Sequence, residues 1–157
     1  MTTIITDIDG VYVPFYARNN PELGFREYEG YGERAFLKPE MQKPWIEEFR
    51  SKATLVWGSK WKEPNKLLAL LGIDDNWEKI EISNQDVGLG TWKIKSIRKW
   101  VNENLSPDEK LVWIDDELEG DAFDWAKDRG NMLSVATDRL VGLTQEQFEE
   151  IIQFISK

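Results

Sequence analysis

The sequence predicts an α/β fold, namely a Rossmann-like, doubly wound parallel sheet of about five strands. Three observations predict it. Short runs of apolar and β-branched residues recur along the chain, and amphipathic helical patterns alternate with them. The third observation is size, because 157 residues with 41% hydrophobic content fill one core of ordinary dimensions. We therefore expect a single domain over residues 1–157.

The expected strands are short runs rich in apolar and β-branched residues, as is typical of strands buried on both faces of a sheet. They cover residues 3–8, 53–59, 77–83, 110–116 and 131–137. The expected helices lie between and after them, over residues 39–51, 63–71, 92–104, 118–129 and 144–155. Because strands and helices alternate, the connections are right-handed crossovers and the strands are parallel, with the first strand central.

Residues 10–38 interrupt this alternation directly after the first strand. They read as a loop followed by two short strands around the turn Gly30-Tyr31-Gly32, which predicts a β-hairpin insertion. The insertion is short, so we expect no large cap domain over the carboxyl edge of the sheet.

Composition excludes several classes of chemistry. The chain has no cysteine and no histidine, so thiolate zinc sites, disulfides and imidazole bases are excluded. Its 29 acidic and 20 basic residues give a net charge of −9, which disfavours a broad nucleic-acid-binding surface. No leader pattern or long apolar run is present, so we expect a cytoplasmic protein with no membrane partner. The oligomeric state stays open.

Chemically capable side chains follow the predicted strands where each strand ends. Asp7 and Asp9 follow the first, Ser59 the second, and the pair Asp115 and Asp116 the fourth. Lys93 lies at the head of the helix after the third strand. Because the carboxyl ends of parallel strands form one edge, where ligands bind, these side chains are expected to converge. Crowded carboxylates repel one another unless a cation lies among them, and Mg²⁺ prefers such oxygen ligands.

This residue set is suited to phosphoryl transfer. Asp7 is the candidate nucleophile that forms an aspartyl-phosphate, and Asp9 the candidate general acid and then base. Ser59 and Lys93, together with Gly58 and Lys60, are the candidate phosphoryl-binding groups. Ser59 has a structural alternative, since a serine there could instead cap the helix expected from Glu63.

The set resembles the four motifs of the haloacid dehalogenase (HAD) superfamily, which are DxD, a serine or threonine, a lysine and an acidic pair. In that resemblance Mg²⁺ is held by Asp7, by the backbone carbonyl of Asp9 and by Asp115, with Asp116 as the alternative to Asp115. Asp9 favours a phosphatase over a dehalogenase or a transport ATPase. The motif lysine is aligned with Lys93, and Lys95 is the alternative.

A narrower resemblance covers nearly the whole chain. It is similar to small HAD-like domains of actinobacteria and their phages, related to the HAD module of Swiss Army Knife RNA repair proteins. The resemblance is carried by GFREYEGYGERAFLKPEMQKPWIEEF, ATLVWGSKWKEPNKLLALLGI, TWKIKSIRKWV, LVWIDDELEGDAFDWA and VGLTQEQFEEIIQFI. Family members commonly read WATGW where this chain has WGSKW at residues 57–61, so serine replaces threonine and Lys60 adds a charge.

The resemblance implies a Mg²⁺-dependent phosphatase that acts on a phosphomonoester. A nucleotide or nucleic-acid end and a small phosphorylated metabolite are equally favoured as substrates. The alternative is a non-catalytic module that binds a partner through metal and phosphate. A phage origin is considered for this module.

The insertion allows two interpretations. Its aromatic and guanidinium groups could form a pocket for a base and a phosphate, or a small cluster that fixes the hairpin to the domain, and we favour the second. These groups are Tyr12, Phe15, Tyr16, Arg18, Arg26, Tyr28 and Tyr31. Elsewhere, we expect Trp45, Trp100, Trp125 and Leu67 to Leu71 in the core, and Asp121 and Asp124 on the solvated face of a helix.

Overall fold

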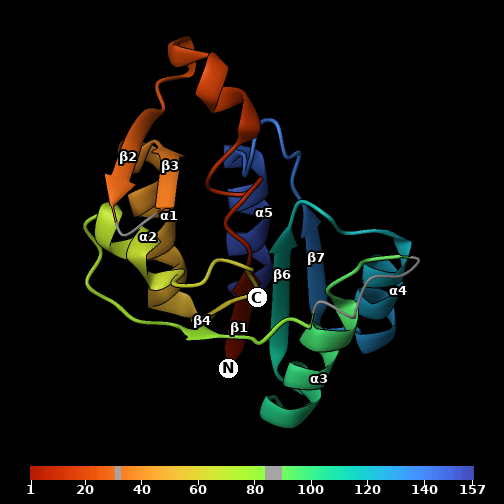
Figure 1. Ribbon diagram of the computed structural model, residues 1–157. Coiled ribbons are helices and arrows are strands. Elements are labelled where there is room, and N and C mark those ends of the chain that lie inside the picture. Colours follow the sequence, from red (N-terminus) through yellow and green to blue (C-terminus); the bar gives the residue numbers. More distant parts are fainter. Residues whose placement is uncertain (31–32, 84–89) are drawn as a thin grey trace.

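The computed structural model describes residues 1–30, 33–83 and 90–157. Its centre is a five-stranded sheet with the strand order β5-β4-β1-β6-β7, in which every neighbouring pair is parallel (Figure 1). The strands are β1 (Thr2–Thr6), β4 (Thr54–Trp57), β5 (Glu78–Lys79), β6 (Lys110–Asp115) and β7 (Met132–Ala136). The predicted parallel α/β sheet with a central first strand is confirmed.

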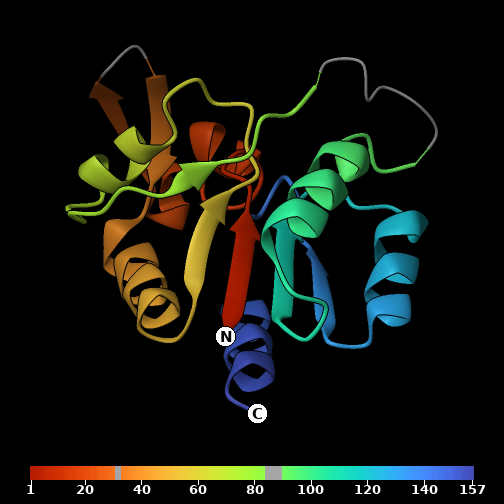
Figure 2. The ribbon, with the colours of Figure 1, turned by 90° about the horizontal axis from the view of Figure 1, so that it is seen from below.

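Helices cover both faces of this sheet. Side chains that alternate along β1 define the two faces, with Ile4 in the core beneath α1, α2 and α5, and Ile5 in the core beneath α3 and α4. Figure 2 shows the sheet between α1 on one side and the pair α3 and α4 on the other. The helices are α1 (Pro39–Lys52), α2 (Asn65–Leu70), α3 (Ile94–Asn104), α4 (Gly120–Arg129) and α5 (Gln145–Ile155).

The insertion after β1 contains two 3-10 helices and a hairpin. The 3-10 helices are η1 (Phe15–Asn19) and η2 (Pro21–Leu23), and the hairpin pairs β2 (Arg26–Gly30) with β3 (Glu33–Leu37) in antiparallel register. Ala35 and Leu37 of β3 are buried in the core, which fixes the hairpin to the domain. The predicted hairpin is therefore present, and no large cap follows it; residues 31–32 of its turn lie outside the described residues.

Some element boundaries differ from those predicted. β5 is two residues long rather than spanning 77–83, as is common for an edge strand that carries charged side chains such as Glu78 and Lys79. Helix α3 begins at Ile94 rather than at Trp92, and Lys93 is its N-cap residue. Thr144 caps α5 in a capping box with Gln147, which explains the sharp start of that helix. None of the helices in the described part of the chain is long and apolar enough to cross a membrane.

Candidate active site

The loop after β1 is a tight turn that carries Asp7 and Asp9 at the carboxyl end of the strand. The backbone carbonyl of Ile8 accepts hydrogen bonds from the amides of Val11, Tyr12 and Val13. Gly10 has a φ of +74°, and a Cβ there would lie 2.4 Å from Oδ2 of Asp116. Only glycine allows both this conformation and this close approach. The turn thus brings the β1 loop against the acidic pair that follows β6.

Lys93 joins the ends of three strands. Its Nζ lies 2.8 Å from Oδ2 of Asp7, 2.8 Å from Oδ2 of Asp115 and 3.0 Å from the carbonyl oxygen of Gly58. The side chain is only 3% exposed. Burial by itself would lower the pKa of Lys93, but the carboxylates of Asp7 and Asp115 outweigh burial and raise it. The ammonium group therefore stays charged and binds the two carboxylates together.

Asp7, Asp115 and Asp116 form a cluster, hereafter the carboxylate cluster, in which one oxygen from each lies within 4.8 Å of the others. Burial first, and then repulsion from Asp115, raises the pKa of Asp7 to about 7, although Lys93 acts in the opposite direction. Burial and the proximity of Asp115 likewise raise the pKa of Asp116 to about 7. Carboxylates that resist ionisation for want of positive charge are a donor set suited to a hard divalent cation.

Asp9 is linked to Ser59 through Trp61. The indole Nε1 of Trp61 donates to Oδ2 of Asp9 over 3.1 Å, and its backbone amide donates to Oγ of Ser59 over 3.1 Å. Partial burial raises the pKa of Asp9, while the indole donor lowers it to a lesser extent. Ser59 is buried and does not cap α2, whose N-cap is Pro64 without a side-chain hydrogen bond. The alternative helix-capping role of Ser59 is therefore not observed.

A cavity of about 200 Å³ opens over Asp7, Asp9 and Lys93, whereas Gly58, Ser59 and Asp115 are not among its lining residues. Its lining combines acids, two lysines and two aromatic rings, namely Asp7, Asp9, Phe15, Lys60, Trp92, Lys93, Asp116 and Glu117. Lys60 lies with its Nζ 5.3 Å from the ring centroid of Trp92, whose Nε1 donates to Glu117. Lys95 is exposed and lines a separate hollow on α3 with Arg98 and Lys99. Lys93, not Lys95, is therefore the lysine that reaches the carboxylates.

Asp121 has a role that the sequence does not reveal. Its Oδ1 accepts hydrogen bonds from the amide (3.1 Å) and hydroxyl (2.6 Å) of Thr91, and the same hydroxyl accepts from the amide of Glu119 (2.8 Å). Asp121 lies on α4, half-buried and outside the lining of the cavity, as expected, but its carboxylate also anchors the segment that carries Lys93. Asp124 is exposed, as expected. A contact across 30 residues has no local sequence signal.

The insertion residues divide between the two interpretations. Tyr12 is fully buried and Tyr28 packs against the core, which fits a structural cluster. Arg26 pairs with Glu40 on α1 at 3.3 Å. Phe15 and Tyr16, by contrast, are 47% and 49% exposed. Arg18 is also exposed, and Tyr31 lies outside the described residues.

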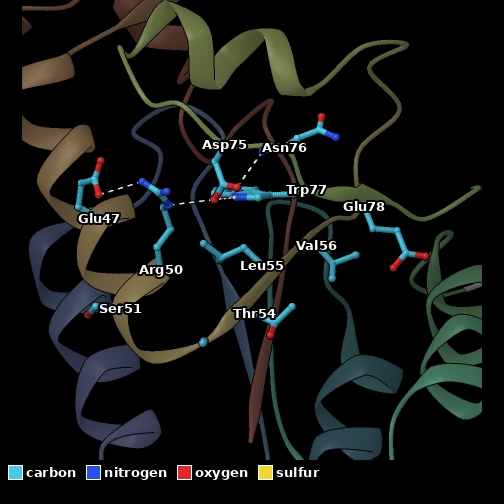
Figure 3. Close-up of a pocket in the computed structure, with 11 residues that line it drawn as sticks. Glu47, Arg50, Ser51, Thr54, Leu55, Val56, Asp75, Asn76, Trp77 and Glu78 are labelled. Carbon is cyan, nitrogen blue, oxygen red and sulfur yellow. Dashed lines mark hydrogen bonds and ion pairs between the residues drawn. The ribbon is translucent and has the colours of Figure 1, made fainter.

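A larger hollow of about 550 Å³ lies away from the predicted site, beside the start of β4 and the end of α1 (Figure 3). Its polar groups already bind one another, since Arg50 donates to Glu47 and Asp75 at 2.9 Å, and Trp77 donates to Asp75 at 2.8 Å. None of the predicted site residues lines it. Size alone therefore does not locate the chemistry of this protein.

The parallel sheet and the acidic site at its carboxyl edge define a domain of the HAD superfamily. The family model for the HAD domain in Swiss Army Knife RNA repair proteins matches residues 3–148, and the chain belongs to this family. HAD domains are generally hydrolases of the phosphatase type, so this class of enzyme is indicated. No curated protein matches the chain significantly.

Proposed function

We propose that the protein is a cytoplasmic, Mg²⁺-dependent phosphatase that hydrolyses a phosphomonoester through an aspartyl-phosphate on Asp7. One observation carries the proposal. Lys93 joins Asp7 to Asp115 beneath an open cavity that Asp9 also lines, which supports placing the proposed nucleophile, cation site and acid around one space.

The carboxylate cluster fits a resident metal ion. Asp7 and Asp115, together with the backbone carbonyl of Asp9, would hold Mg²⁺, with Asp116 as the alternative to Asp115. When bound, Mg²⁺ supplies positive charge that keeps the carboxylates ionised and neutralises phosphoryl oxygens. The pKa of about 7 for Asp7 supports this role, since without added positive charge much of the nucleophile is protonated at neutral pH.

The protein groups divide the remaining chemistry. A carboxylate oxygen of Asp7 attacks phosphorus, the bond from phosphorus to the leaving oxygen breaks, and Asp9 gives its proton to that oxygen. Asp9, now ionised, takes a proton from water, which attacks the phosphoryl group and releases inorganic phosphate with free Asp7. Lys93 and the hydroxyl of Ser59 stabilise charge on the phosphoryl oxygens, and Lys60 and the Gly58 segment border the phosphate.

The substrate class follows from two opposing considerations. The family description names RNA repair proteins, which supports a nucleotide or nucleic-acid end. The net charge of −9 opposes contact with a long polynucleotide, which supports a small phosphorylated metabolite.

The test is a hydrolysis screen with purified protein and Mg²⁺ against nucleotides, sugar phosphates, end-phosphorylated oligonucleotides and p-nitrophenyl phosphate. We expect Asp7→Asn to abolish turnover, and Asp9→Asn to reduce it by about 10²–10⁴ for an alkyl phosphate. The exposed acid Asp124 provides the matched control, and Asp124→Asn is expected to retain full activity. Binding of Mg²⁺ and phosphate without turnover of any substrate would contradict the proposal and would favour the alternative, a non-catalytic binding module.

A further inference from the structure

A second cavity adjoins the one above the carboxylates. It measures about 220 Å³ and is lined by Asp9, Val13, Pro14, Phe15, Arg18 and Phe36. Asp9 and Phe15 line both cavities, so the two spaces share a wall. The second cavity is made almost wholly by the insertion, whose helices η1 and η2 rise beyond the carboxyl end of β1 (Figure 1).

We propose that this second cavity binds the leaving group, and that it selects phosphomonoesters whose leaving group carries a flat ring and a second anionic group. The inference rests on the proposed phosphatase function and adds the substrate class to it. Its starting point is Asp9. A general acid must lie within hydrogen-bond reach of the leaving oxygen, so the leaving group extends past Asp9 and away from Asp7. The second cavity begins at that point.

The ring is inferred from Phe15. This side chain is 47% exposed although its backbone is firmly held, since its amide donates to the carbonyl of Arg139 over 2.9 Å. Phe36 of β3 and Pro14 complete an apolar wall around it. An exposed aromatic ring on a fixed backbone is a stacking surface for a planar group. At about 220 Å³ the space is smaller than the ~300–1,000 Å³ of drug-sized sites, so it holds one ring system.

The second anion is inferred from Arg18. Arg18 lines the same cavity and is exposed, and within the described part of the chain no carboxylate forms an ion pair with it. Arginine binds phosphate through several donors at once, which makes an unpaired guanidinium beside an apolar wall a specific receptor for a phosphorylated ring compound. A nucleoside bisphosphate and the phosphorylated end of an oligonucleotide share this chemistry.

The first experiment compares kcat/KM of the wild-type protein with Mg²⁺ for three substrates. A nucleoside 3′,5′-bisphosphate has ring and second anion, a nucleoside monophosphate has the ring alone, and ribose 5-phosphate has neither. We expect kcat/KM to fall in that order. A phosphorylated trinucleotide forms a fourth arm, and a higher value than for the bisphosphate would identify the nucleic-acid end as the source of the ligand. Equal values for the first three substrates would overturn the inference.

The second experiment uses variants with a matched control. Phe15→Leu should lower kcat/KM about tenfold for both ring-containing substrates, within the range expected for loss of one base-stacking contact, and by a clearly smaller factor for ribose 5-phosphate. Arg18→Gln should lower kcat/KM for the bisphosphate alone. Tyr16→Leu is the control, because Tyr16 is 49% exposed on the same helix and lines neither cavity. A uniform loss on all substrates in Phe15→Leu would show that Phe15 only shapes the site.

A third measurement separates this inference from the phosphatase proposal. Calorimetric titration of the bisphosphate into Asp7→Asn protein reads binding without turnover. If the wild-type protein hydrolyses nothing, the phosphatase proposal fails, yet binding that Phe15→Leu weakens would still support the second cavity as a ring site. Absence of binding, or binding equal in Phe15→Leu and Tyr16→Leu, would overturn the inference whatever the activity.

Discussion

Replacement of Lys93 by methionine tests the central contact of the site. Methionine keeps the unbranched apolar stem of lysine but lacks the ammonium group, so the carboxylates of Asp7 and Asp115 lose the partner that lies 2.8 Å from each. Both carboxylates are buried, so water would replace that partner poorly. We therefore expect Lys93→Met to destabilise the fold before any question of activity arises.

The size of the effect follows from this burial. Removal of one partner of a buried ion pair costs about 3–5 kcal/mol, because it leaves an uncompensated charge. With a urea slope of about 2 kcal/mol/M for a chain of this size, the unfolding midpoint should fall by about 1.5–2.5 M. The loss should be larger at pH 8 than at pH 5.5. At the lower pH the unpaired carboxylates can take up protons and lose their charge.

The assay is urea unfolding at both pH values, with Mg²⁺ and with chelator. Lys95→Met is the matched control, since Lys95 is exposed on the same helix, and a change within about 0.5 kcal/mol is expected there. Mg²⁺ should narrow the gap between Lys93→Met and wild type, because a cation substitutes for the ammonium charge. A loss below about 1 kcal/mol at pH 8 in chelator, the range of an exposed pair, would refute the assigned contact.

Three further outcomes are expected. Trp61→Phe removes the indole donor that lowers the pKa of Asp9, so the pKa of Asp9 should rise. Because Asp9 must be protonated to act as the acid, the descending limb of the plot of kcat/KM against pH should shift to higher pH for an alkyl phosphate. A limb at the same pH as in the wild type would exclude the coupling between Trp61 and Asp9. Asp121→Ala should cost about 1–3 kcal/mol by unpairing the donors of Thr91, and should lower kcat, whereas Asp124→Ala should do neither. In chelator, the melting temperature should fall from pH 5.5 to pH 8. Asp7 and Asp116 of the carboxylate cluster have pKa values raised to about 7, so between these pH values the folded state binds more protons than the unfolded state and loses stability as the protons dissociate. Mg²⁺ should reverse this pH dependence. A melting temperature that rises with pH in chelator would contradict the prediction.

The sequence predicts the architecture well because the relevant signals are local. Each strand is a short apolar run, each helix has its own period, and parallel topology follows from their alternation. The meeting of Asp7, Lys93 and Asp115 is also predictable, since all three lie at strand or helix ends on one edge of the sheet. Their catalytic roles stay predictions.

What the sequence does not reveal depends on tertiary packing. The bond from Trp61 to Asp9 joins residues 52 positions apart, and no spacing rule links them. The approach of Gly10 to Asp116 and the anchoring of Thr91 by Asp121 are of the same kind. Length of an edge strand is likewise set by its neighbours, which is why β5 is shorter than its apolar pattern indicates.

The charge balance of the first cavity bears on the proposed need for a metal ion. Its lining contains four acids, Asp7, Asp9, Asp116 and Glu117, against two lysines, Lys60 and Lys93. A fully ionised lining would repel a phosphomonoester dianion, and Lys93 is already bound to two carboxylates. A divalent cation at the carboxylate cluster would offset the excess of two negative charges before the substrate arrives. An acidic lining that by itself would repel a phosphate is therefore one that the proposed Mg²⁺-dependent reaction would require to be neutralised by the cation.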